Sequence, residues 1–159
     1  MTTPTAHDWS LLDQLLQRDA ASSEQLLHLL LDERKALESR DYAQFEALVA
    51  PKKQLVEQLE QNQGIRQQHL RQLGFSTDID ALQAAQKRAP EVASRWQATA
   101  ELWHECQTAN QVNEQICRRT RLIVERTLDI LRGQHEQSTT YDARGSAQRT
   151  GSGRTISSA

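Results

Sequence analysis

The longest pattern of apolar and polar positions covers residues 91–132, which contain no glycine and no proline. Apolar and small side chains recur along it every seven positions, the spacing typical of a helix that lies along other helices. As one α-helix, these roughly 42 residues would be about 60 Å long. The three rows are Trp96, Trp103, Asn110, Cys117, Val124 and Leu131; Leu102, Ala109, Ile116, Ile123 and Ile130; and Thr99, Cys106, Asn113, Thr120 and Thr127.

The rows change character at two asparagines, Asn110 and Asn113. Before them, large side chains such as Trp96 and Trp103 favour packing in the core of the chain's own bundle. After them the rows turn to β-branched residues and threonines, which favours a partner other than this chain alone. An asparagine on such a face commonly fixes helix register. Two interpretations stay open for the pair: a register lock within the chain, or a position beside a groove that receives another protein's helix.

Two earlier amphipathic stretches predict an antiparallel pair of helices. The first runs from about residue 8 or 10 to residue 39, with leucines and small residues at spacings of three and four. A very short turn around residues 39–40 follows, and Asp41 is a good N-cap for the second helix. The charged residues 32–35 fall mostly off the first apolar stripe. Lys52 falls on the second, where its stem would cover leucines or, alternatively, its charge would contact a partner.

Proline and glycine are expected to divide the second helix. Pro51 lies inside the apolar pattern and should kink the helix or restart it, because proline lacks a backbone donor. Gly64 and Gly74 should each end a helix. The sequence therefore predicts a short, separate helical piece at residues 65–73.

Turn and cap residues predict the bounds of the last two helices. Thr77 or Asp78 would cap a short helix at residues 79–88. Pro90 suits the first turn of the long helix, where proline is well tolerated. Gly133 suits the C-cap of that helix.

The expected architecture is all-α: an antiparallel, coiled-coil-like helical bundle with one very long C-terminal helix. The bundle would occupy residues 1–133. Residues 134–159 contain only Tyr141 and Ile156 as large apolar side chains, too few to bury the surface that folding requires. The sequence therefore predicts a disordered tail from residue 134.

Composition narrows the function classes. The net charge is −2 and the pI about 6.2, whereas a nucleic-acid binder usually has a strong basic excess. The cluster Arg118, Arg119, Arg121 and Arg126 is diluted by neighbouring carboxylates and is interpreted as a solvated helix face. Neither a signal peptide nor an apolar run long enough for a bilayer is present, so no membrane insertion is expected and the predicted location is cytoplasmic.

Candidate chemistry is sparse. Cys106 and Cys117 would lie about 16 Å apart on one helix, beyond the reach of a disulfide, and are interpreted as small buried residues. The five histidines are dispersed, and no zinc-binding or catalytic motif occurs. The sequence predicts no metal site, no cofactor and no enzymatic activity.

The C-terminal half carries RWQ at 95–97, Cys106, NQVN at 110–113, LDIL at 128–131 and TYDARG at 140–145. In this combination the chain resembles the FlgN family of flagella synthesis proteins, type III export chaperones for hook–filament junction proteins. The resemblance covers most of the chain and is weakest at residues 62–90. It implies a cytoplasmic chaperone that keeps hook-associated proteins soluble and delivers them to the flagellar export apparatus.

The resemblance also implies site residues. In that family the C-terminal amphipathic helix receives the client's amphipathic C-terminal segment, and a tail tyrosine is associated with docking to the export gate. The tyrosine corresponds to Tyr141. The chain departs from the family where Glu114 and Asp142 replace glycines. The implied client-binding residues are Ile116, Ile123, Val124, Leu128, Ile130 and Leu131, with Asn110 and Asn113 beside them.

An alternative from a different class is a non-catalytic helical scaffold, or a coiled-coil oligomer, that has no client. The sequence leaves a homodimer possible in either case. A chaperone would form a defined complex with junction-protein termini, whereas a scaffold would form homo-oligomers indifferent to them.

Overall fold

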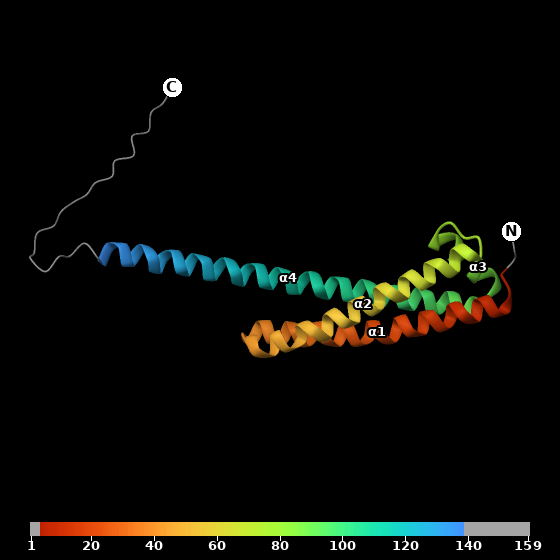
Figure 1. Cartoon of the computed structure of the whole chain (residues 1–159), viewed down its shortest axis with the longest axis horizontal. Coiled ribbons are helices and arrows are strands. Elements are labelled where there is room, and N and C mark those ends of the chain that lie inside the picture. The colour runs from red at the N-terminus through yellow and green to blue at the C-terminus, as the bar shows by residue number, and fades with distance from the viewer. Residues whose placement is uncertain (1–3, 139–159) are drawn as a thin grey trace, which may run out of the picture. The chain divides into compact units, whose positions relative to one another are not determined.

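The computed structural model describes the backbone of residues 4–138 and the side chains of residues 4–132. Within that range the chain is all-α, as predicted, with α1 (Ala6–Ser39), α2 (Tyr42–Gln72), α3 (Asp78–Arg88) and α4 (Pro90–Ser138) (Figure 1). The chain divides into two compact units, which meet between Cys117 and Arg118. The first unit holds α1, α2, α3 and the beginning of α4; the second holds the remainder of α4.

The α1–α2 hairpin forms where capping residues place it. Thr5 and Asp8 form a capping box that begins α1, each side chain bonding to the other's backbone. Arg40 ends α1 in the left-handed conformation, at φ 58°, and Asp41 accepts a hydrogen bond from the backbone N–H of Gln44 at 3.0 Å. The predicted short turn and the predicted N-cap of the second helix are therefore confirmed.

Two predicted divisions of the second helix are wrong, because α2 continues from Tyr42 to Gln72 without a restart at Pro51 and without an end at Gly64. The predicted end near Gly74 is confirmed. Pro51 and Ala47 are exposed, so the carbonyl left without its helical donor faces solvent and can bond to water. Gly64 costs the helix about 1 kcal/mol. The buried side chains Asn62 and Arg66 on either side of it hold the helix together.

We expect opposite effects from alanine at the two glycines of this region. Gly64→Ala should stabilise the protein by about 0.5–1 kcal/mol, because a Cβ there meets no atom within 4 Å and alanine favours helix. Gly74→Ala should destabilise it by about 1 kcal/mol, because Gly74 has a φ of +85°. Urea denaturation followed by circular dichroism measures both; equal signs for the two variants would contradict this account.

The last two helices begin as the sequence predicts. Thr77 caps α3, and Pro90 occupies the first position of α4. The predicted end of α4 at Gly133 is wrong, since the helix continues to Ser138. A single glycine among helix-favouring residues costs about 1 kcal/mol, too little to stop it. The first five residues of the predicted tail therefore belong to the helix, and the residues from 139 onward, including Tyr141, lie outside the described part of the chain.

Two apolar clusters hold the first unit together. One gathers α3 and the start of α4 against the beginning of α1, and Trp9 contacts Phe75 with ring centroids 6.2 Å apart. Its buried members are Trp9, Leu12, Leu16, Leu70, Ala81, Ala85, Val92, Ala93 and Trp96. The second joins Leu26 and Leu30 of α1 to Cys106 and Ala109 of α4. Packing of α4 in the first unit therefore follows the predicted seven-residue rows.

Candidate partner-binding surface

Five apolar side chains line one face of α4 after Cys117, and all five are exposed. Ile123 and Ile130 are seven residues apart, as are Val124 and Leu131, and Leu128 adjoins Val124 and Leu131 at spacings of four and three. Their exposed fractions range from 44% for Leu128 to 62% for Ile130. We call these five residues the apolar stripe. A contiguous exposed apolar surface of this kind is typical of a protein-interaction site.

Two residues close to the stripe in sequence, Thr127 and Leu122, do not belong to it. The Thr127 hydroxyl donates to the Ile123 carbonyl oxygen at 2.8 Å, so this threonine satisfies its donor locally. Leu122 is also exposed, at 53%, but the 100° turn per residue places it nearly opposite the middle of the stripe. Leu122 is therefore a natural control position for any test of the stripe.

The structure places Asn113 inside the first unit. Its side chain is 1% exposed, and its Nδ2 donates to the Leu30 carbonyl oxygen at 2.8 Å and to Glu33 Oε1 at 3.1 Å. Its Oδ1 accepts from Arg34 Nε at 3.2 Å. All these contacts are to α1 of the same chain, so they favour the interpretation of Asn113 as a register lock.

Two other predicted site residues of the first unit lie nearer the surface. Asn110 is partly buried, and its Nδ2 donates to Glu114 Oε1 at 3.0 Å, one turn along the same helix. Ile116 is also partly buried. Both remain predictions as contacts for a partner.

A buried carboxylate organises the Asn113 contacts. Glu33 is 4% exposed, and both of its oxygens accept hydrogen bonds from Lys52 Nζ at 3.1 Å. Lys52 thus uses its charge within the chain, in a contact that the sequence did not predict. The Arg34 guanidinium adds a bond to the Ala109 carbonyl oxygen at 3.4 Å. This polar layer ties α1, α2 and α4 together.

A second polar layer lies deeper in the first unit. Arg66 of α2 forms an ion pair with Asp19 of α1, and both side chains are almost completely buried. The guanidinium carbon of Arg66 lies 4.7 Å from the ring centroid of Trp103, a cation–π contact with α4. Burial raises the pKa of Asp19, and the positive charge of Arg66 opposes that shift.

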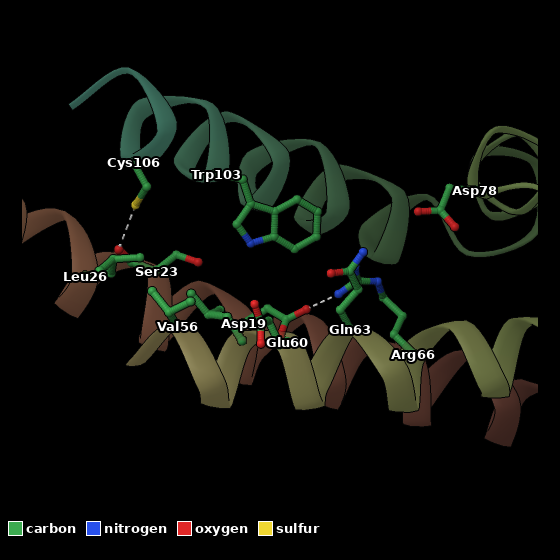
Figure 2. A pocket seen from close by; sticks show the side chains of 11 residues that line it. Asp19, Ser23, Leu26, Val56, Glu60, Gln63, Arg66, Asp78, Trp103 and Cys106 are labelled. Atoms are coloured by element: carbon green, nitrogen blue, oxygen red, sulfur yellow. Dashed lines mark hydrogen bonds and ion pairs between the residues drawn. The ribbon is translucent and has the colours of Figure 1, made fainter. Parts of the chain in front are cut away.

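A cavity of about 360 Å³ adjoins this layer. Figure 2 shows Trp103 and Cys106 on one side of it, across from Asp19 and Ser23. The buried atoms Ser23 Oγ and Arg66 Nε have no hydrogen-bond partner among the protein atoms. Apolar surface makes up most of the cavity's lining, but polar atoms of Asp19, Ser23 and Arg66 also face it, and it is roomy enough for water molecules to bond to them.

Sequence reasoning missed both ion pairs, because it placed residues 32–35 mostly off the apolar stripe and did not single out Asp19 or Arg66. The signal lay in the spacing. Asp19 and Glu33 are 14 residues apart on α1, and Lys52 and Arg66 are 14 residues apart on α2. The pairs match in reverse order, as antiparallel helices require. Opposite charges at heptad positions of two antiparallel helices would have indicated them.

The described residues show little that resembles a catalytic centre. In the described part of the chain, no three histidine, cysteine or acidic residues gather as a metal site. Cys106 donates its thiol to the Ser23 carbonyl oxygen at 3.3 Å, and burial raises its pKa, which favours the unreactive thiol. Among the same residues, no helix combines the length and the apolarity needed to cross a bilayer.

Comparisons with known proteins agree with the resemblance. The family model described as FlgN protein matches residues 10–149. The crystal structure of a FlgN flagella synthesis protein from Pseudomonas aeruginosa is similar to this chain, with 36% identity and a TM-score of 0.64. The similarity covers 72% of this chain and 90% of that one. No curated protein matches the sequence.

Proposed function

Because the chain belongs to the FlgN family, we propose that it is a cytoplasmic export chaperone for hook-associated flagellar proteins. It binds the amphipathic C-terminal segment of a junction protein and delivers that client to the flagellar export apparatus. The family is one of flagellar chaperones without enzymatic activity. The observation that supports the proposal is the apolar stripe on α4, whose exposed side chains are accessible to a partner helix.

Helix-in-groove pairing provides the physical basis of client binding. An amphipathic segment that is unfolded before assembly exposes its apolar face and aggregates unless that face is covered. Ile123, Ile130 and their neighbours on the apolar stripe offer matching positions at spacings of three, four and seven. Binding alone supplies the protection, so neither nucleotide hydrolysis nor a cofactor enters the mechanism. Tyr141 as the export-gate contact stays a prediction from the family resemblance.

Co-expression of the full chain with the C-terminal segments of hook-associated proteins tests the proposal. We expect one complex of defined stoichiometry in size-exclusion chromatography with light scattering. Ile123→Asp should weaken binding more than about tenfold, since it places a charge where an isoleucine would be buried. Adding Ile130→Asp should abolish the complex.

Leu122→Asn is the control, because it introduces a polar side chain on the side of the helix opposite the middle of the stripe without placing a carboxylate beside Arg119 and Arg126. Its affinity for the client should stay within about twofold of the wild type, and circular dichroism should show equal helicity in all three variants. Separate elution of every client segment would overturn the proposal. Homo-oligomers indifferent to those segments would instead support the scaffold alternative.

A further inference from the structure

Arginines border the apolar stripe along both edges. Arg119 and Arg126 are seven residues apart and lie along the edge next to Ile123 and Ile130. Arg121 and Arg132 lie along the opposite edge, next to Leu128. All four are exposed. From this arrangement we infer that the partner is an amphipathic helix that carries carboxylates on both sides of its apolar face, an inference that rests on the proposed function.

The local charge differs from that of the chain as a whole. Residues 118–132 contain five arginines against two carboxylates, Glu125 and Asp129, whereas the whole chain has a net charge of −2. Arg121 is partly compensated by its exposed ion pair with Glu125, at 2.8 Å. Arg119 and Arg126 form no ion pair within the described residues. The edge that they form is therefore the stronger attractor for acidic groups.

The same arginines disfavour a second copy of this chain as the occupant. In a parallel pair of helices, the Arg119 and Arg126 edge would face the Arg121 and Arg132 edge of the other copy. In an antiparallel pair it would face its own counterpart. Either orientation opposes arginine to arginine, and like charges across a helix interface select against the pairing. The charge pattern therefore favours a different protein over a second copy of this chain as the partner.

The arginines would also attract a nucleic acid, but the apolar stripe between the two arginine edges does not suit nucleic-acid binding. Single-stranded binding surfaces stack bases on aromatic side chains. The apolar stripe consists of isoleucine, valine and leucine, without an aromatic residue. These aliphatic side chains match the apolar face of a helix, so the acidic helix is the occupant that both the charge and the shape favour.

Three synthetic peptides that differ only in their flanking charges test the inference. Each has about four heptads, well above the roughly 12–15 residues below which an isolated helix is marginal, with leucine and isoleucine on the apolar face. The positions bordering that face carry glutamate, glutamine or lysine. Fluorescence anisotropy with the full-length protein measures their dissociation constants. We expect the glutamate peptide to bind most tightly, with a dissociation constant at least about tenfold lower than that of the lysine peptide. High salt should remove this difference.

Charge reversal on the protein should reverse the order. In Arg119→Glu/Arg126→Glu we expect the lysine peptide to bind more tightly than the glutamate peptide. Lys35→Glu/Lys53→Glu is the matched control, with the same change in net charge at two exposed lysines of the first unit. It should keep the wild-type order. Sedimentation velocity should show the wild-type protein as a monomer.

The possible failures are distinguishable. Equal affinities for the three peptides would overturn the inference and leave the proposed function standing. Failure of both the peptides and the hook-associated segments to bind would overturn the proposed function itself. A single-stranded RNA that binds through Arg119 and Arg126 more tightly than the glutamate peptide would replace the acidic helix with a nucleic acid. A wild-type dimer broken by Ile123→Asp would also overturn the inference.

Discussion

Replacement of Arg66 by methionine is expected to destabilise the first unit by about 3–5 kcal/mol. The substitution leaves Asp19 at 1% exposure without its ion-pair partner and removes the cation–π contact with Trp103. Methionine keeps most of the volume of the side chain, so the loss comes from the uncompensated charge and only slightly from packing. Chemical denaturation followed by circular dichroism measures the change in the free energy of unfolding.

The pH dependence identifies the cause. In wild type, burial raises the pKa of Asp19 and Arg66 opposes the rise, so removing Arg66 should raise that pKa further. An acid whose folded-state pKa lies above its unfolded value stabilises the fold least when it is ionised. The defect of Arg66→Met should therefore shrink from about pH 7.5 to about pH 4.5, as Asp19 takes up a proton. A defect independent of pH would contradict this explanation.

A double replacement completes the test. Asp19→Leu/Arg66→Met removes both charges, and its stability should return to within about 1–2 kcal/mol of the wild type, because two apolar side chains can replace a buried ion pair. Lys53→Met, in an exposed pair with Glu57 at 3.7 Å, should change stability by less than about 0.5 kcal/mol. A double variant as unstable as Arg66→Met would show that volume and not charge is responsible.

Asn113→Ala is expected to cost about 2–3 kcal/mol while leaving client affinity nearly unchanged. The substitution removes the bonds to the Leu30 carbonyl oxygen and to Glu33, and it deprives Arg34 Nε of its acceptor. Loss of stability without loss of binding is the signature of a register lock. Denaturation and a client titration on the folded variant measure the two quantities separately.

Asn110→Ala is the matched control for this prediction, because among the described residues Asn110 bonds to Glu114 of its own helix and to no other helix. Its stability should change by less than about 0.5 kcal/mol. If Asn113→Ala instead retained full stability and lost the client, the asparagine would act as a partner contact.

The repeated pattern of residues 91–132 was sufficient to predict the long helix and the change in its surroundings. Large residues such as Trp96 are buried, and β-branched residues such as Ile123 are exposed, as the rows indicated. The prediction worked because a seven-residue period specifies both a helix and the face that it offers. The hairpin turn was equally predictable, since Asp41 is a capping residue that acts through local contacts.

The errors arose where tertiary contacts outweigh local preference. Pro51 and Gly64 weaken a helix locally, but α2 continues because its packing partners lie on α1 and α4. The burial of Asp19 and Glu33 depends on which residue of another helix stands opposite each carboxylate. A pattern read along one helix at a time does not contain that information. Comparing the charges of the two heptad rows would have supplied it.

The positions of the tryptophans have a practical consequence. Trp9 and Trp96 are buried in the first unit, and Trp103 lies there beneath Arg66. The chain contains only these three tryptophans, so its indole emission originates entirely outside the apolar stripe. Intrinsic fluorescence therefore follows the integrity of the bundle, whereas a dye on the peptide follows occupancy of the stripe. One sample can give both readings without interference between them.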